Sequence, residues 1–336
     1  MPDGSVRYGR AFAPAHVSGI FVPRLDSRDP RGRGSLGAGL VLDAGVQACA
    51  EWQAATRSTL RMTADVRSPL EISEAVARRL LARRGGRLTV RLEHALPIGQ
   101  GFGSSAAGAL ATGLAVAAAL EIPRRRAVEV AHLADLFGGG GLGGVAAILG
   151  GGLEVRLRAG LPPFGRIVRE PVDRTVLVGT AGAPIRSPGV LRDSARMRGF
   201  AGGTELFDAF AAGPSWEAFW TVSERFTDSV RLTTPRLTTI LRGLRRRGAR
   251  AAQAMFGRSF FAAPAPGEGG ARVRRWLTEA GVPFREVAVA RKGARLLAVR
   301  GGGPARPGPW EYDTSTGPVA RDGARSLGVR ADARVF

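Results

Sequence analysis

The sequence is poor in the residues that build disulfides and metal centres. Cys49 is the single cysteine among 336 residues, so no internal disulfide can form. The three histidines, His16, His94 and His132, are dispersed along the chain and show none of the spacings of a metal site. These absences exclude a disulfide-stabilised scaffold and a metal centre built from histidine and cysteine.

Long apolar runs are also missing. The longest, residues 106–120, is interrupted by Gly108, Thr112 and Gly113 and falls short of the roughly 20 residues that a membrane-spanning helix needs. The first residues carry charge and glycine rather than an apolar stretch, which argues against a signal peptide. We therefore expect a protein with no membrane partner in a cytoplasmic setting.

Lysine is nearly absent, although the chain is strongly basic. The net charge is +21, yet Lys292 is the single lysine among 49 basic residues. This skew toward arginine is typical of a compositional bias, and the densest arginine cluster, residues 241–250, contains no aromatic residue on which a base could stack. We therefore expect no specific nucleic-acid partner, and only a nonspecific attraction of small anions.

The length of the chain predicts two domains, each with its own core. An apolar content of 44% is typical of a globular protein. We expect an N-terminal domain over residues 1–162, a C-terminal domain over residues 163–300 and a Gly/Pro/Arg-rich tail over residues 301–336. The turn-rich segment 160–165 is predicted to be the hinge between the halves.

Hydrophobic periodicity predicts a mixture of strands and helices. Residues 8–22 are expected to begin as a strand and to break into a loop. Further strands are predicted at 40–50, 87–94, 153–158, 175–180, within 253–263 and at 284–290. Helices are predicted at 70–84, 106–120, 125–137, 206–212, 216–230, 235–247 and 273–280.

A glycine-rich loop follows the predicted strand at residues 87–94. It runs from Pro97 to Ala107 with the sequence PIGQGFGSSAA. Its glycines let the backbone approach a ligand closely, and Ser104-Ser105 opens a predicted helix whose free N–H groups and dipole favour a phosphate. A serine hydroxyl at this point can also bind Mg²⁺. The pattern predicts a nucleotide-dependent small-molecule kinase with ATP and Mg²⁺ as cofactors.

Two other phosphate-binding motifs do not fit this loop. A Walker A motif needs a lysine where Gly103 stands, and the dinucleotide fingerprint needs the spacing G-x-G-x-x-G rather than G-x-G-x-G. A tight turn packed against small helical residues is the structural alternative. The residues expected to contact ATP are Pro97, Gly99, Gln100, Gly101, Phe102, Gly103, Ser104, Ser105 and Ala106.

The loop resembles the P-x-x-x-G-x-G-S-S-A motif of the GHMP kinases, the superfamily of galactokinase, homoserine kinase, mevalonate kinase and phosphomevalonate kinase. Other blocks resemble its archaeal pantoate kinase branch, so that the resemblance extends from about residue 8 to residue 300. These blocks are residues 11–21, 29–39, 131–135 with 141–143, 253–257 and 293–295.

The resemblance implies an α+β fold of two domains. The N-terminal half would resemble domain 2 of ribosomal protein S5, and the C-terminal half would be ferredoxin-like, with the active site between them. It also implies a homodimer that phosphorylates pantoate to 4-phosphopantoate in coenzyme A biosynthesis. The alternatives are a diverged GHMP kinase that acts on another small hydroxy acid or alcohol, and a nucleotide-binding homologue with impaired catalysis.

The resemblance also implies roles for single residues. Ser104 and Asp135 would bind Mg²⁺, and Asp135 would be catalytic. His16, where other GHMP kinases carry lysine, would be catalytic or would contact the substrate. The pantoate carboxylate needs a cation, and the substrate candidates besides His16 are Arg24, Arg33, Ser35 and Arg186. A structural role is the alternative for Asp135 and for His16.

Four positions depart from the family pattern. Gly144 stands where the family usually has aspartate, a position that serves as catalytic base elsewhere in the superfamily. Leu36 replaces an arginine, Gly140 a hydroxyl residue and Ala15 a glycine. Losing a general base typically costs about 10²–10⁴-fold in rate, yet homoserine kinases of the same superfamily do without this aspartate. The sequence alone therefore leaves open whether the enzyme is active.

Overall fold

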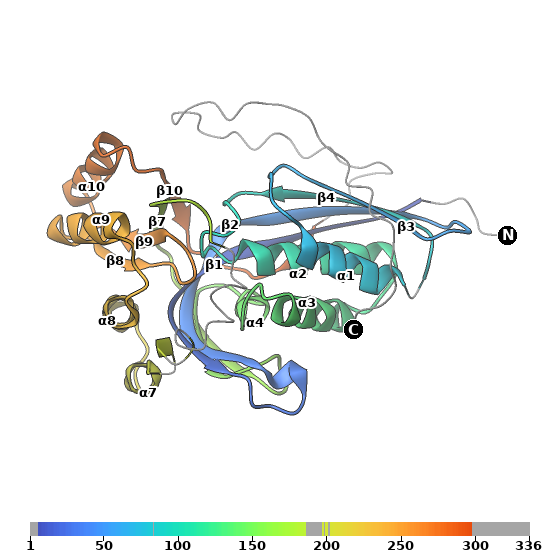
Figure 1. The fold of residues 1–336 in the computed structure, drawn as a ribbon, viewed down its shortest axis with the longest axis horizontal. Helices are drawn as coiled ribbons and strands as arrows, with labels where there is room; N and C mark the ends of the chain where they lie inside the picture. The colour runs from blue at the N-terminus through green and yellow to red at the C-terminus, as the bar shows by residue number, and fades with distance from the viewer. Residues whose placement is uncertain (1–5, 83, 186–196, 198, 201, 298–336) are drawn as a thin grey trace.

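The computed structural model describes residues 6–82, 84–185, 197, 199–200 and 202–297 (Figure 1). Arg186 and the predicted tail at 301–336 lie outside the described residues. The described chain forms two β-sheets with helices packed on them, which confirms the predicted α+β class. In this part of the chain, no helix combines the length and the apolar character needed to cross a membrane.

The larger sheet has seven strands in the order β11-β1-β2-β4-β3, with β5 paired to β2 and β6 paired to β5. Neighbouring strands are antiparallel except for β3 and β4, which are parallel. The strands are β1 Val6–Arg24, β2 Gly34–Gln53, β3 Thr59–Ala64, β4 Arg87–His94, β5 Leu153–Arg158, β6 Arg166–Glu170 and β11 Arg295–Leu296.

Three long helices cover one face of this sheet (Figure 1): α1 Glu71–Leu81, α2 Ser104–Ala119 and α3 Arg124–Phe137. Helix α2 is buried almost throughout because it is built of alanine, glycine and other small residues. A Cβ on Gly9 of β1 would overlap the carbonyl of Ala115, so glycine allows strand and helix to touch. This close packing holds the C-terminal part of α2 on β1, and the phosphate loop ends at the opposite, N-terminal end of the helix.

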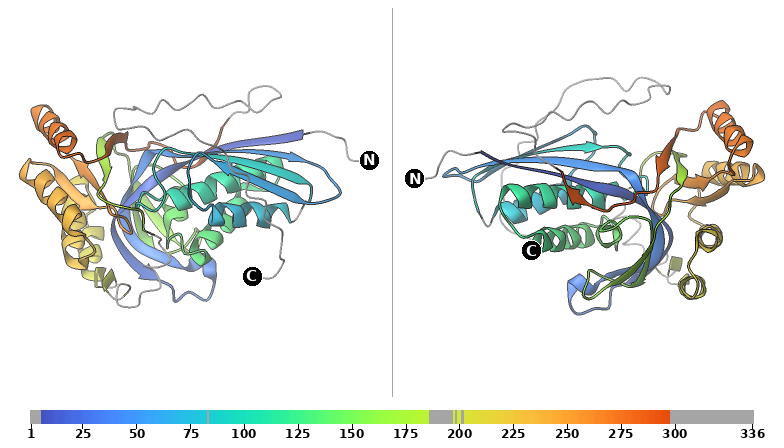
Figure 2. Two further views of the ribbon diagram at one scale, coloured as in Figure 1. Left: turned by 45° about the horizontal axis from the view of Figure 1, so that its top comes forward. Right: turned by 180° about the vertical axis from the view of Figure 1, so that it is seen from behind.

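The smaller sheet has the order β10-β7-β9-β8 and forms the second half of the chain (Figure 2). Its apolar residues pack on α9 and α10 on one side, and on α8 and the larger sheet on the other. The elements are β7 Thr175–Thr180, α7 Thr204–Ala211, α8 Trp216–Val230, α9 Pro235–Arg246, β8 Arg250–Gln253, β9 Ser259–Ala263, α10 Glu268–Glu279 and β10 Phe284–Ala288.

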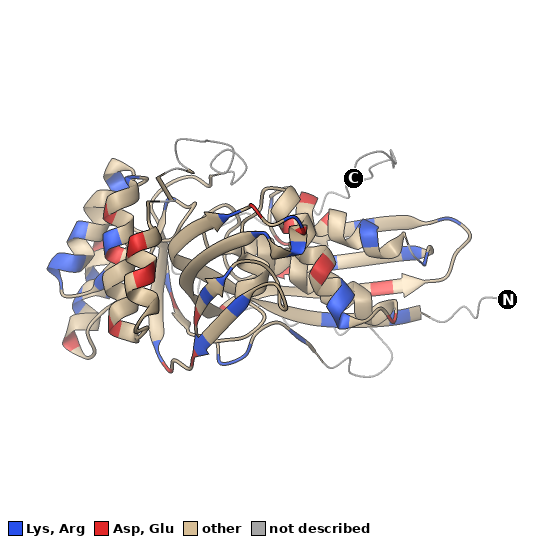
Figure 3. Ribbon diagram, turned by 90° about the horizontal axis from the view of Figure 1, so that it is seen from below, with Lys and Arg blue, Asp and Glu red and all other residues tan. Residues whose placement is uncertain are grey.

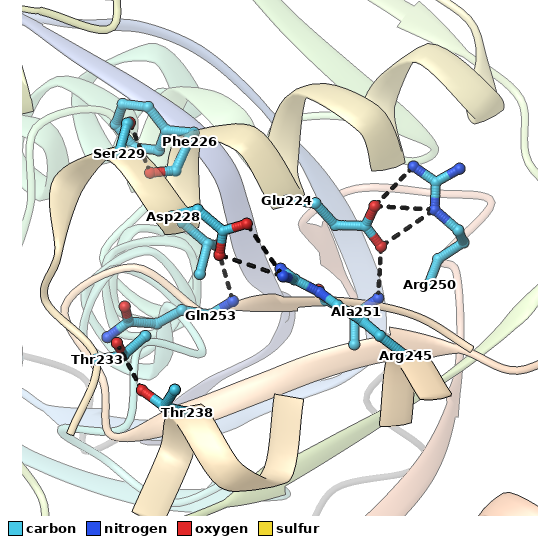
Figure 4. Close-up of polar contacts among 11 residues, drawn as sticks. Glu224, Phe226, Asp228, Ser229, Thr233, Thr238, Arg245, Arg250, Ala251 and Gln253 are labelled. Carbon is cyan, nitrogen blue, oxygen red and sulfur yellow. Dashed lines mark hydrogen bonds and ion pairs between the residues drawn. The ribbon is translucent and has the colours of Figure 1, made fainter. Parts of the chain in front are cut away.

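Polar contacts attach α8 and α9 to β8 (Figure 4). The Glu224 carboxylate of α8 accepts hydrogen bonds from the Arg250 guanidinium at 3.1 Å and from the Ala251 amide at 3.0 Å. Arg245 of α9 pairs with Asp228 of α8 at 3.1 Å. These contacts hold β8 in place just before the turn at residues 254–257, which meets the phosphate loop.

The structure corrects the predicted course of two segments. Residues 8–22 do not break into a loop, because β1 absorbs Pro14 and Gly19 in register shifts at Pro14/Ala15 and Ser18/Ile20 and continues to Arg24. The segment 160–165 joins β5 to β6 within one sheet. The change of sheet falls between β6 and β7, at residues 171–174, rather than at the predicted boundary at 162.

Figure 3 shows the basic and acidic positions along the ribbon, seen from below. Blue arginine positions are scattered along both halves, with acidic positions among them on the helices of the second half. Several of these charges are paired across elements, as in Arg274–Glu286 at 2.7 Å and Arg7–Glu121 at 2.6 Å.

Candidate active site

The phosphate loop connects β4 to α2 and lies against the second half of the chain. Gly101 adopts φ +74°, a conformation that side chains disfavour. A Cβ at this position would stand 2.6 Å from the Met255 carbonyl oxygen and 2.7 Å from that of Ala254. The glycine is therefore needed for the packing of the loop on the turn at residues 254–257, a reason that the motif alone did not reveal.

Gln100 and Phe102 tie the loop to both halves. The Gln100 side chain donates to the Gly182 carbonyl at 2.8 Å, and the Ser259 hydroxyl donates to the Gln100 carbonyl. The His16 amide of β1 donates to the Phe102 carbonyl at 3.0 Å. The Gln100 side-chain nitrogen and backbone carbonyl are thus bonded to the second half, whereas Oε1 has no partner among the described residues, and β1 holds the last turn of the loop.

The N-terminus of α2 opens toward a pocket. The first i→i−4 bond of the helix runs from the Ala107 amide to the Gly103 carbonyl at 2.9 Å, so the amides of Ser104, Ser105 and Ala106 precede it and have no partner within the helix. Gly103, at the N-cap, supplies no side chain to cap them. Such an end attracts an anion, above all a phosphate.

Asp135, near the end of α3, is a buried carboxylate beside this helix N-terminus. It is 2% exposed, and its Oδ1 has no hydrogen-bond partner among the described residues. Burial raises the pKa of Asp135 to about 7. A Cβ built on Gly140 would overlap Asp135 Oδ1 and would stand 2.8 Å from the Ser105 hydroxyl oxygen. Asp135 and Ser105 therefore face the same point.

The surroundings of Asp135 fit a bound Mg²⁺. A buried carboxylate without a partner is costly, and a cation would compensate it. Within the described residues there is no cluster of three or more histidine, cysteine or acidic side chains that could hold a metal. Mg²⁺ suits such a place because it commonly takes one or two carboxylates and completes its shell with phosphate oxygens and water.

The two serines at the start of α2 differ in their contacts. The Ser104 hydroxyl donates to the carbonyls of Leu96 and Pro97, each at 3.3 Å. It therefore stabilises the loop in this structure. The Ser105 hydroxyl lies on the Asp135 side, so Ser105 is better placed than the predicted Ser104 to share a metal with Asp135.

His16 lies on β1 with its ring directed to a buried ion pair. Its Nε2 is 2.9 Å from Oε1 of Glu154, which is fully buried on β5. The same Glu154 oxygen accepts a short hydrogen bond from Arg156 Nη1. Burial lowers the pKa of His16, although the Glu154 hydrogen bond opposes this shift. His16 is therefore neutral near pH 7, with its Nε2 engaged by Glu154.

The structure brings together some of the predicted substrate residues and not others. Ser35 is in the pocket, and its hydroxyl has no partner within the described part of the chain. Arg24 donates to the Pro23 carbonyl at 2.9 Å and Arg33 to the Ser27 carbonyl at 2.8 Å. Neither arginine is among the described residues that line the pocket.

Arg156 is the pocket cation that the sequence reasoning missed. It is buried, lines the pocket and donates to Glu154. The available signal was the pattern of β5, where Glu154 and Arg156 alternate with Leu153 and Val155 in a strand whose first four residues are all buried. Two charges on the inward face of a buried strand indicate a pair, because an unpaired charge would not be kept there.

These groups line one pocket between the phosphate loop, the glycine-rich turn at residues 140–144 and the second half. Pro97 and Gln100 are absent from its described lining, whereas the other predicted ATP contacts are present. The lining residues are His16, Ser18, Phe21, Ser35, Gly99, Gly101, Phe102, Gly103, Ser104, Ser105, Ala106, Asp135, Gly140, Gly141, Leu142, Gly143, Gly144, Arg156, Met255 and Phe256.

Gly140→Ala is expected to lower kcat/KM for Mg·ATP about tenfold. The new methyl group would overlap Asp135 Oδ1 and approach Ile72 Cδ1 at 2.6 Å, so the carboxylate would have to move, and small displacements of a catalytic group are expensive. Gly141→Ala is the matched control, because its methyl group would stand 3.3 Å from Asp135 Oδ2. Steady-state kinetics at varied Mg·ATP distinguish the two. Equal values for both variants would contradict the placement of the metal site.

Known proteins resemble this chain in sequence and in fold. Residues 71–152 match the family described as GHMP kinases N terminal domain. A solved structure described as a phosphotransferase related to the CoA biosynthesis pathway superposes with a TM-score of 0.77 at 28% identity, covering 86% of this chain and 98% of its own. The N-terminal part of the chain thus matches the GHMP kinase family, as the phosphate loop indicated, and the fold resembles that of this phosphotransferase.

The chain is also similar in sequence to two archaeal pantoate kinases. It is 38% identical over 162 residues to the pantoate kinase of Thermococcus kodakarensis, covering 46% of this chain and 54% of the relative. It is 35% identical over 185 residues to that of Methanospirillum hungatei, covering 54% and 63%. The match thus spans between half and two thirds of the length of these two relatives.

Proposed function

We propose that this protein is an ATP- and Mg²⁺-dependent kinase that phosphorylates pantoate to 4-phosphopantoate. The observation that carries the proposal is the meeting of the free α2 N-terminus, the unpaired Asp135 carboxylate and the buried Arg156 guanidinium in one pocket. Phosphoryl transfer needs donors for phosphate oxygens, a metal ligand and a substrate anchor. The similarity to pantoate kinases supports a substrate that carries both a hydroxyl and a carboxylate.

Each residue of the pocket has a proposed task. The amides at the start of α2 bind phosphate oxygens of ATP, and Asp135 with Ser105 holds the metal. When bound, Mg²⁺ neutralises charge that develops on the phosphates. Arg156 binds the substrate carboxylate, since a guanidinium matches a carboxylate in shape and charge. Ser35 donates or accepts a hydrogen bond with the substrate through its hydroxyl. His16 lies beside the substrate, on the side of the phosphate loop.

The setting of the enzyme is also a proposal. We propose a cytoplasmic homodimer that acts on a small molecule without a specific nucleic-acid or membrane partner. This rests on the resemblance to metabolic kinases and on the scattered charges in Figure 3. Binding of pantoate and Mg·ATP by isothermal titration calorimetry, followed by ATP consumption with a panel of hydroxy acids, tests the substrate. Turnover of another hydroxy acid in preference to pantoate would refute the substrate assignment.

Gly144 favours a second candidate, a nucleotide-binding homologue with impaired catalysis. It begins the short helix α4 (Gly144–Ala147), where a Cβ would stand 2.7 Å from Ala106 Cβ and 3.8 Å from Asp135 Oδ2. Position 144, which would hold the catalytic base, thus borders the proposed metal site. In this chain it is a glycine and supplies no side chain. Binding of Mg·ATP without turnover of any acceptor would establish this alternative.

Gly144→Asp is expected to change kcat by no more than roughly tenfold, or about 1.4 kcal/mol in barrier height. A loose transition state needs little help from a base, so the parent should already be an active kinase. Gly144→Ala introduces the same contact with Ala106 without a carboxylate, and the comparison of the two variants isolates the carboxylate. A large gain for Asp over Ala, from an inactive parent, would show that catalysis had decayed.

A further inference from the structure

Glu154 is a buried carboxylate for which the proposed reaction has no direct use. It lies on β5 opposite Gly39 of β2 and Arg169 of β6, and it is 0% exposed. Its Oε1 contacts both His16 Nε2 and Arg156 Nη1, whereas Oε2 has no partner among the described residues. Glu154 is absent from the described lining of the pocket, so it acts through its two neighbours.

The contacts of Glu154 require an ionised carboxylate. Burial alone would favour the neutral acid, but the Arg156 charge and the His16 hydrogen bond outweigh it and hold the pKa of Glu154 below its ordinary value. A buried ion pair of this kind is weak evidence for stability, because desolvation consumes most of the attraction. The position therefore calls for an explanation other than stability.

Glu154 fixes the tautomer of its first neighbour, His16. Because the ring is neutral and Nε2 faces a carboxylate, the proton must sit on Nε2 and leave the lone pair on Nδ1. Gly39 makes this arrangement possible, since a Cβ there would overlap His16 Nε2. The His16 amide is bonded to the Phe102 carbonyl at 3.0 Å, so the ring is held relative to the phosphate loop.

The second neighbour, Arg156, is held by one nitrogen. Nη1 is bonded to Glu154, while Nε has no partner within the described residues. A Cβ on Gly143 would stand 3.4 Å from Nε and 3.0 Å from the Ser35 hydroxyl oxygen. The unused part of the guanidinium thus faces the same spot as Ser35, on the pocket wall formed by the glycine-rich turn.

We propose that Glu154 is a positioning residue for the substrate, which holds the Arg156 guanidinium toward the pocket and fixes the proton of His16 on Nε2. This inference rests on the proposed function, because it assumes that Arg156 binds the substrate carboxylate. Glu154 itself touches neither substrate nor nucleotide. Loss of Glu154 should therefore weaken the binding of the acceptor substrate and leave the binding of ATP unchanged.

Glu154→Gln keeps the shape and removes the charge. We expect the KM for pantoate, and its dissociation constant by calorimetry, to rise about tenfold, which corresponds to the loss of one charge-assisted hydrogen bond. The KM for Mg·ATP should change less than about twofold. Glu224→Gln is the matched control, because Glu224 also pairs with an arginine, Arg250 of β8 (Figure 4), and neither residue is among the described residues that line the pocket. It should leave both constants unchanged.

A double-mutant cycle tests whether Glu154 acts through Arg156. In an Arg156→Met background, Glu154→Gln should add little to the loss of pantoate binding, because the group that it positions is gone. The inference would be overturned if folded Glu154→Gln kept the parental KM for pantoate, or if it raised the KM for pantoate and for Mg·ATP equally. It would also be overturned if the two substitutions had fully additive effects on pantoate binding. If Glu154→Gln does not fold, Glu154→Asp keeps the charge on a shorter side chain and should show the same selective loss; parental kinetics would refute it.

A measurement without turnover separates this inference from the proposed function. The chain has three histidines, so ¹⁵N NMR can resolve the ring nitrogens of each, with Glu154→Gln and His94→Gln spectra for assignment. His16 should carry its proton on Nε2 in the wild-type protein. A proton on Nδ1 would refute the role of Glu154 even if pantoate is phosphorylated. Failure of the wild type to phosphorylate pantoate would instead refute the substrate assignment.

Discussion

Asp135→Asn is expected to lower turnover with Mg·ATP by a thousandfold or more, which corresponds to about 4 kcal/mol in barrier height. Asp135 is the one carboxylate among the described residues that line the pocket, and asparagine supplies no negative charge to hold Mg²⁺. Stopped-assay kinetics at saturating pantoate give kcat for both proteins. A variant that retains a tenth or more of the parental kcat would show that the metal is held elsewhere.

The same residue sets an expected pH dependence. Burial raises the pKa of Asp135 from an ordinary 3.8 to about 7, so in the free enzyme the carboxylate is protonated below that pH. We expect kcat/KM for Mg·ATP to rise with pH through a midpoint near 7, since only the ionised form binds the metal. A profile that is flat from pH 6 to 8 would contradict this assignment.

Stability should respond with the opposite sign. Between pH 3.8 and about 7, the folded protein keeps a proton on Asp135 that the unfolded chain has lost. The contribution of Asp135 to the free energy of unfolding therefore falls as pH rises through this window. Without Mg²⁺, Asp135→Asn should be more stable than the parent at pH 8 and equal to it near pH 4. Thermal melts with and without Mg·ATP check this, because the metal complex should stabilise the parent alone.

Gly101→Val is expected to reduce kcat/KM for Mg·ATP on the order of a hundredfold or more. The branched side chain disfavours φ +74° and would meet the carbonyls of Met255 and Ala254 at 2.6 and 2.7 Å. Neither carbonyl can yield without moving the turn at residues 254–257. The loop would therefore leave the second half, and the amides of α2 would lose their alignment with the pocket.

Gly248→Val is the matched control for this variant. Gly248 has φ +78°, almost the same strained conformation, but nothing lies within 4 Å of a Cβ there. It should lower the melting temperature through backbone strain alone and leave kcat/KM near the parental value. Equal kinetic losses in the two variants would mean that packing on residues 254–257 is not the reason for the glycine at 101.

The sequence predicted correctly those elements that depend on residues close to one another in the chain. The alternation of 87–94 became β4, and the runs at 106–120 and 125–137 became α2 and α3 to within two residues. The helix N-terminus at Ser104 was also predictable, because the glycines before it and the small residues after it lie next to each other in the chain. Periodicity and capping act over a few residues, so a sequence displays them.

The elements that were missed depend on distant partners. Strands β3, β6 and β11 were not predicted, since each is short and exists because a longer neighbour offers it an edge. The Glu154–Arg156 pair is of the same kind, because its burial follows from the pairing of β5 with β2 and β6. Arg24 and Arg33 were predicted because they lie in or beside blocks that resemble the family, yet both donate to nearby backbone carbonyls.

Strands β1 and β2 belong to both hydrophobic cores. Ala11 and Ala13 pack under α2, whereas Ala15 and Val17, a few positions along the same strand, pack with the aromatic residues of the second half. The two halves therefore cannot rotate as rigid bodies about a flexible linker, because strands β1 and β2, which join them, contribute buried residues to both cores. Substrate exchange must come instead from bending of this ribbon at its bulges or from small sliding of packed layers, the shear type of motion.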